Sequence, residues 1–267
     1  MSTLAYTVSD STTMLRRNLR RLRRYPSLTL LLIGMPIVFL LLFVYVFGGQ
    51  LGHGLGDEYV AGHTGRAGYL NYVTPGILLM TIAAAVQGTA IVVAMDMTGG
   101  IIDRFRTMAI ARSAVLTGHV LASLLQALLS VGIVLGVAVA LGFRPEASML
   151  DFLAAFGLLT LFAFALIWLA TALGLAAKSV ETASNTPMFL TFLPFLGSGF
   201  VLVATLPTGL EQFARYQPFT PVTETLRGLL TGTPIGTNAI FAVAWSVGIA
   251  LGSYVWARHL YTSRRSA

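Results

Sequence analysis

Six long apolar runs dominate the sequence and limit the folds that the chain can adopt. Each run has 20 or more residues, and none carries Asp, Glu, Lys or Arg except at its ends. A helix needs about 20 apolar residues to cross the hydrocarbon core of a bilayer. The runs comprise residues 28–47, 73–95, 120–143, 152–177, 187–206 and 238–257. We therefore expect an all-α integral membrane protein with six transmembrane helices, which form one domain over residues 28–260.

The distribution of charge supports a membrane protein and predicts its orientation. Only 10% of the residues are charged, whereas soluble domains carry about 25%. The net charge is +7, but the basic residues flank apolar runs, which favours anionic lipid headgroups over nucleic acid as partners. An even number of spans places both termini on one side, and Lys and Arg concentrate in the cytoplasm. The sequence thus predicts a multi-pass plasma-membrane protein with cytoplasmic tails at residues 1–27 and 261–267.

This orientation places 13 of the 17 basic residues in the cytoplasm and leaves only four outside. The cytoplasmic residues are Arg16, Arg17, Arg20, Arg21, Arg23, Arg24, Arg104, Arg106, Arg112, Lys178, Arg258, Arg264 and Arg265. The outer residues are Arg66, Arg144, Arg215 and Arg227.

Residues 10–25 have the pattern of an amphipathic helix that lies in the headgroup plane. Asp10 or Ser11 can cap its start, and Tyr25, which precedes a proline, should end it. Leucines lie on one arc of the helix and arginines on the opposite arc, as in interfacial helices. A solvated basic tail is the alternative. The arginines of this predicted interfacial helix are Arg16, Arg17, Arg20, Arg21, Arg23 and Arg24.

Residues 96–118 form a polar interruption between two apolar runs and have a helical pattern of their own. The glycines at 99 and 100 permit a sharp turn. Beyond them, Ile101, Phe105 and Met108 share one side of a helix, and charged residues point elsewhere. A helix of about two turns is unstable by itself. It therefore needs a membrane or a partner protein to lie against.

Several motifs in this order resemble ABC type-2 transporter permeases, most closely the daunorubicin/doxorubicin-resistance branch. They are MPIVFLLLFVYVFGG at 35–49, YVTPGIL at 72–78, IIDRFRTM at 101–108, LGFRPE at 141–146 and LRGLLTG at 226–232. Ala109 and Gln217 depart from the pattern, which usually has proline at the first position and an Asn-Pro pair at the second. The resemblance implies that a separate ATPase subunit binds ATP and Mg²⁺ and docks on the 96–118 segment. The implied coupling residues are Asp103, Arg104, Phe105, Arg106, Met108 and Arg112.

Residues 207–234 separate the last two apolar runs, and Pro207, Pro218 and Pro221 divide them into two short amphipathic pieces. Pro218 divides the stretch into two predicted amphipathic helices. Glu224 and Arg227 are expected on the polar face of the second helix. Similar permeases have short re-entrant helices here that dip into the outer leaflet, and the resemblance implies the same for this chain.

The sequence lacks the residue patterns that ATP-binding proteins, proton-driven carriers and intramembrane proteases need. Lys178 is the only lysine and no phosphate-binding loop surrounds it, so the chain should bind no ATP itself. The spans lack the acidic and basic relays of proton-driven carriers and the residue sets of intramembrane proteases. The chain has no cysteine, and the His and carboxylate residues of the glycine-rich loop at 48–71 lack the fixed geometry of a metal site. We expect a permease that is not an enzyme and holds no metal or cofactor.

The remaining prediction is a permease driven through its cytoplasmic face by a separate ATPase. Two copies, identical or related, should pair to form the path for cargo. Its predicted walls are apolar, aromatic and hydroxyl-bearing, which suits a lipophilic or amphipathic molecule. The resemblance implies efflux of a drug or secondary metabolite; the alternatives are export of a lipid or glycan precursor and a non-transporting membrane scaffold. The predicted path residues are Met80, Gln87, Asn185, Met188, Phe189 and Phe192, together with Thr81 and Thr89.

Overall fold

A computed structural model of the chain describes residues 26–54, 65–98 and 112–263. The described residues form helices, turns and loops, without a strand. The predicted interfacial helix at 10–25 lies outside them and stays a prediction. The same holds for the coupling residues from Asp103 to Met108, whereas Arg112 is the first residue of a long helix.

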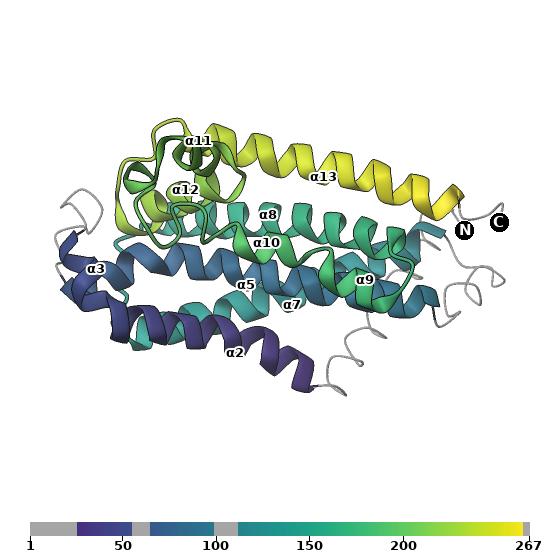
Figure 1. Cartoon of the computed structure of the whole chain (residues 1–267), viewed down its shortest axis with the longest axis horizontal. Coiled ribbons are helices and arrows are strands. Elements are labelled where there is room, and N and C mark those ends of the chain that lie inside the picture. Colours follow the sequence, from purple (N-terminus) through teal and green to yellow (C-terminus); the bar gives the residue numbers. More distant parts are fainter. Residues whose placement is uncertain (1–25, 55–64, 99–111, 264–267) are drawn as a thin grey trace.

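Long helices run side by side along the molecule, and shorter ones lie near its ends and along its middle (Figure 1). The first long helix is α2 (Pro26–Leu42), which continues through the π-helical turn η1 (Phe43–Phe47) into α3 (Gly48–Gly54). The other long helices are α5 (Gly65–Thr98), α7 (Arg112–Ala140), α8 (Met149–Ala176) and α13 (Asn238–Ser263). The shorter ones are α9 (Val180–Asn185), α10 (Met188–Phe192), the 3-10 turn η2 (Val203–Thr205), α11 (Thr208–Tyr216) and α12 (Phe219–Thr231).

Five helices of the described part are long and apolar enough to cross a membrane. They correspond to five of the six predicted spans. The sixth, 187–206, is not one continuous helix: α10 ends at Phe192 and turns follow over 193–201. Pro194 lacks an amide hydrogen for helical bonding, and Gly197 and Gly199 favour irregular backbone. The expectation of six complete transmembrane helices is therefore not met, although this segment still runs from α9 at one end of the bundle to α11 at the other (Figure 1).

Helix α5 lies at the centre of the bundle and is buried along most of its length. It contacts α2, α3, α7, α8, α9, α10 and α12. Three of its threonines are satisfied within the helix: the hydroxyls of Thr74, Thr81 and Thr89 donate to carbonyls four residues earlier at 2.6, 2.8 and 2.9 Å. Such bonds let hydroxyl residues lie in an apolar interior without a partner on another helix.

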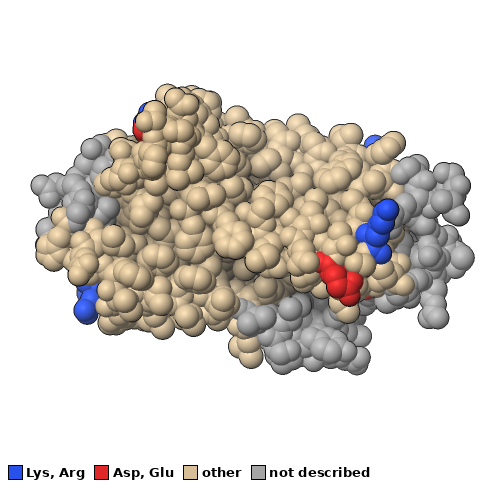
Figure 2. All heavy atoms as spheres, viewed as in Figure 1, with Lys and Arg blue, Asp and Glu red and all other residues tan. Residues whose placement is uncertain are grey.

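The outer helices expose apolar side chains, as expected for a protein surrounded by lipid. Ile240 of α13 is 72% exposed and Leu30 of α2 is 67% exposed. In the face shown in Figure 2, charged side chains lie toward the two ends of the molecule and the middle is uncharged. Together with the five long apolar helices, this surface indicates a multi-pass membrane protein.

The helices begin and end at different residues from those predicted. Helix α5 starts at Gly65, well before 73, and α3 extends the first helix into the predicted outer loop. Helix α8 is capped by Ser148, and Asp151 lies in its first turn. Both are parts of one capping box, in which the Asp151 amide donates to the Ser148 hydroxyl and the Asp151 carboxylate accepts from the Ser148 amide.

Candidate functional site

A buried contact joins the two helices that flank residues 99–111. Asp96 lies in the last turns of α5 and His119 in the second turn of α7. The distance from His119 Nε2 to Asp96 Oδ2 is 3.2 Å, and the two side chains are 5% and 2% exposed. The ends of the predicted coupling segment are thus held together by a polar contact that is shielded from solvent. The sequence placed Asp96 in this segment but missed His119, which directly precedes an apolar run.

The predicted path residues on α5 lie inside the protein. Met80 is 7% exposed, and Thr81 and Thr89 are buried with their hydroxyls bonded to their own helix. Gln87 is partly buried and its amide donates to the Ser184 carbonyl at 3.1 Å. This bond attaches α5 to the end of α9, next to the other predicted path residues.

The predicted path residues that follow α9 lie on the surface of the single chain. Met188, Phe189 and Phe192 of α10 are 46%, 53% and 52% exposed, and Asn185 is also exposed. Since α10 contacts α5, the two sets belong to neighbouring elements. The predicted path residues on α5 are mostly buried, whereas those on α9 and α10 are exposed in the isolated subunit.

Four phenylalanines that the sequence did not single out form a cluster between the first helix and the non-helical segment. Phe39 and Phe43 come from α2 and η1, and Phe195 and Phe200 lie on opposite sides of the Gly-Ser-Gly turn. The rings of Phe195 and Phe200 stack with centroids 4.4 Å apart, and Phe43 lies 4.7 Å from Phe200. Aromatic pairs of this kind add to simple burial. The recurrence of Phe at 39, 43 and 47 was the signal available in the sequence.

The stretch before the last long helix does form two short helices, as predicted, but their environments differ. Helix α11 is largely exposed and carries an ion pair from Arg215 to Glu211 at 2.7 Å. Helix α12 begins after Pro218 and is almost wholly buried. Arg227, which was predicted to lie on the polar face of the second helix, has a fully buried side chain, whereas its partner Glu224 is 21% exposed.

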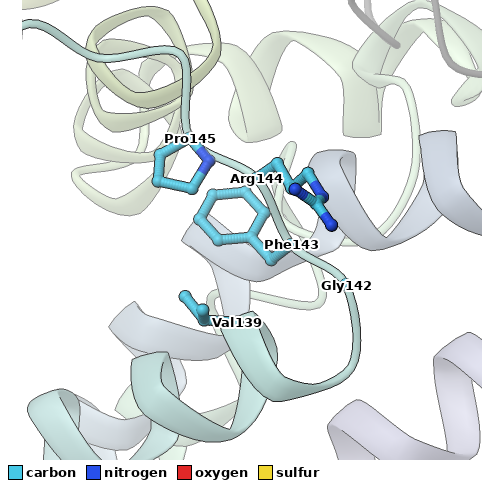
Figure 3. Close-up of a pocket in the computed structure, with 5 residues that line it drawn as sticks. All are labelled: Val139, Gly142, Phe143, Arg144 and Pro145. Carbon is cyan, nitrogen blue, oxygen red and sulfur yellow. The ribbon is translucent and has the colours of Figure 1, made fainter.

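An open pocket lies where the chain leaves α7 and turns toward α8 (Figure 3). It is lined by Val139, Gly142, Phe143, Arg144 and Pro145. The Phe143 ring lies between Val139 and Pro145, and Arg144 extends to the other side of the loop (Figure 3). None of the predicted path residues lines this pocket.

The short helix α9 presents a carboxylate at its N-terminus. Ser179 caps the helix by accepting from the Thr182 amide at 3.2 Å. Hydrogen bonds from the backbone amide of Glu181 and from the Ser179 hydroxyl lower the pKa of the Glu181 carboxyl. The charge therefore persists at neutral pH, where it suits the positive end of the helix dipole. This contribution would be lost as the pH falls through the lowered pKa.

Comparison with known proteins defines the class. The profile of the ABC-2 type transporter family matches residues 10–231, so the chain belongs to this family of transporter permeases and is not itself an enzyme. Family membership implies a membrane setting and an ATPase as a separate partner subunit.

Two similar curated proteins are drug-resistance permeases. The chain is 27% identical over 248 residues to the daunorubicin resistance ABC transporter permease protein DrrB1 of Streptomyces coeruleorubidus, with 92% of this chain and 81% of the relative covered. It is 24% identical over 246 residues to the probable doxorubicin resistance ABC transporter permease protein DrrC of Mycobacterium tuberculosis, with 90% and 84% covered.

Proposed function

We propose that this chain is the transmembrane subunit of an ATP-driven exporter that moves a lipophilic or amphipathic drug or secondary metabolite out of the cell. The names of the two relatives, which are drug-resistance permeases, support the class of cargo. The observation that carries the proposal is the buried contact between Asp96 and His119 at the root of the 96–118 segment. A force applied to this segment would act on α5, the central helix, and on α7 together.

The proposed docking surface for the ATPase consists of Asp103, Arg104, Phe105, Arg106 and Met108, with Arg112 at the start of α7. Phe105 would be the buried anchor and the arginines the charged rim, as in interfaces whose binding energy is concentrated in few residues. Because α5 contacts α2, α8 and α12, a displacement of its end would reach most of the bundle. This role requires the segment and both termini to be cytoplasmic, in agreement with the bias of basic residues.

The proposed path for cargo lies between two permease copies, either identical or related. The exposed Met188, Phe189 and Phe192 of α10 support this arrangement, since a second copy would enclose them. Their apolar and aromatic side chains suit a lipophilic cargo. Gln87 and Asn185 would provide polar contacts near the same element.

Reconstitution tests the proposal. The chain is co-expressed with an ABC ATPase subunit, and the purified complex is placed in liposomes with doxorubicin as the probe. We expect ATP-dependent movement of doxorubicin and stimulation of ATP hydrolysis by it, neither of which should occur with the permease alone. An exporter of lipid or glycan precursors would hydrolyse ATP without moving doxorubicin. A scaffold would show neither stimulation nor transport, and either result would contradict the proposed cargo class.

A further inference from the structure

Arg227 is fully buried and makes contacts with three separate segments of the chain. Its Nη2 donates to the carbonyl of Ser198 at 2.6 Å and to the carbonyl of Tyr72 at 3.1 Å. Its Nη1 bonds to Glu224 at 2.6 Å, and the guanidinium lies 3.9 Å from the centre of the Tyr72 ring. We call these four residues the arginine joint. The joint connects α12, α5 and the non-helical segment 193–200.

The non-helical segment needs such partners because its backbone lies inside the bundle. Irregular backbone is tolerated at membrane depth only where protein groups or water satisfy its polar atoms. Three further side-chain bonds serve this purpose. They are Gln217 Nε2 to the Leu193 carbonyl at 3.2 Å, the Ser198 amide to Thr220 Oγ1 at 3.3 Å, and the Tyr69 hydroxyl to the Phe200 carbonyl at 3.1 Å. Side chains from three places therefore hold this segment: α5, α12 and Gln217, which lies between α11 and α12.

The arginine joint lies close to a proline inside α5. Tyr72 directly precedes the turn that contains Pro75, whose missing amide leaves this part of the helix short of one backbone donor. At the next residue, the backbones of Gly76 and Gly199 meet so closely that a Cβ on Gly76 would lie 2.4 Å from the Gly199 carbonyl oxygen. The interrupted segment thus touches α5 at the residue that follows Pro75.

We propose that Arg227 is a positioning residue for export, which makes segment 193–200 follow α5 when the ATPase acts. The inference rests on the proposed function, because it assigns the route by which motion of α5 reaches the predicted path. Segment 193–200 directly continues α10, which carries Met188, Phe189 and Phe192. Weakening of this joint should loosen the coupling of α10 to α5, so that more ATP is hydrolysed for each molecule of cargo moved.

Arginine has the chemistry that this position requires. Its planar guanidinium donates in several directions at once and can stack on an aromatic ring, whereas the lysine ammonium is a single point. Lysine at 227 would keep the buried charge near Glu224 but could not make all the contacts with Tyr72 and Ser198. Arg227→Lys is therefore the variant most able to fold while weakening the joint.

The test compares Arg227→Lys with Arg215→Lys, which changes the exposed arginine of α11. Complexes with the ATPase are reconstituted, and doxorubicin transported per ATP hydrolysed is measured. Loss of one charged hydrogen bond corresponds to about a tenfold change in an equilibrium, so we expect the ratio for Arg227→Lys to fall by about that factor. The ratio for Arg215→Lys should equal that of the unmodified complex. Equal ratios in all three complexes would overturn the proposal.

A second measurement needs no cargo. The chain has no native cysteine, and Ser198 is 1% exposed, so Ser198→Cys should react slowly with maleimide. Its own side chain takes no part in the joint, which uses the Ser198 carbonyl. We expect Arg227→Lys to raise the labelling rate about tenfold and Arg215→Lys to leave it unchanged.

The combined outcomes separate this inference from the proposed function. If the unmodified complex moves no doxorubicin, the proposed cargo is wrong, and the labelling of Ser198→Cys alone decides on the joint. Unchanged labelling in Arg227→Lys would contradict it. A proportional loss of ATP hydrolysis and transport, with Ser198→Cys still protected, would show that Arg227 supports only the fold.

Discussion

His119 contributes a buried imidazole at the point where α5 and α7 approach the predicted coupling segment. We expect His119→Ala to lower the stability of the purified protein by about 1–3 kcal/mol, because the buried Asp96 loses a hydrogen-bond partner. The melting temperature of each purified variant in detergent measures this loss of stability. His259→Ala is the matched control, since His259 is exposed on α13. Equal melting temperatures for the two variants would contradict a stabilising role for the contact.

The environment of a single polar residue could not be read from the sequence alone. Helical periodicity correctly places Glu224 and Arg227 near each other, but it assigns both to one polar face and does not reveal that Arg227 is fully buried. Arg227 is buried because its acceptors are the carbonyls of Tyr72 and Ser198, which come from distant parts of the chain. Local pattern contains no information about such tertiary partners.

At the scale of elements, close contacts between backbones should control the stability of the bundle. Gly76→Ala places a Cβ 2.4 Å from the Gly199 carbonyl oxygen, so α5 and segment 193–200 must move apart. Overpacking of this kind costs about 1–3 kcal/mol. Gly136→Ala on α7 meets nothing within 4 Å and should be neutral or slightly stabilising, since alanine favours a helix.

Thermal unfolding of the two glycine variants provides the comparison. The melting temperature of Gly76→Ala should fall clearly below that of Gly136→Ala. If both variants had the same melting temperature, the close approach of Gly76 and Gly199 would not determine how α5 packs against segment 193–200.

Helices were predictable where composition alone decides the structure. Six apolar runs are long enough to cross a bilayer, and five of them form long helices. Run 187–206 has the same apolar character, but Pro194 and the turn at Gly197 and Gly199 interrupt it. The start of α5 at Gly65 was missed because its first turns include glycines, Arg66 and Asn71, which do not continue the apolar pattern even though Gly68 and Asn71 are buried.

For the whole molecule, the bias of basic residues predicts which surfaces face the cytoplasm. Single cysteines can report this, because the chain has none of its own. We expect an impermeant thiol reagent added to intact cells to leave one group unlabelled and to label the other, in keeping with the bias of basic residues. The unlabelled positions should be Ser11, Thr107, Ser184 and Ser263. The labelled positions should be Gly62, Ser148 and Thr208. Labelling of Thr107→Cys from outside would reverse the orientation.

In the proposed mechanism, a separate ATPase drives this permease through the 96–118 segment. Phe105→Ala removes the proposed anchor, and truncation of such an anchor commonly costs about 2 kcal/mol or more of binding free energy. Arg106→Ala removes a rim charge and should give a smaller defect that grows with ionic strength. Phe241→Ala, on the exposed face of α13, controls for the loss of a phenylalanine elsewhere.

The most direct measurement is capture of the ATPase by the tagged permease, combined with doxorubicin efflux from the same cells. Phe105→Ala should insert into the membrane normally, lose the ATPase and abolish efflux, whereas Phe241→Ala should retain both. If Phe105→Ala kept the ATPase and exported doxorubicin at the normal rate, the segment would be an ordinary loop and the proposed coupling would be wrong.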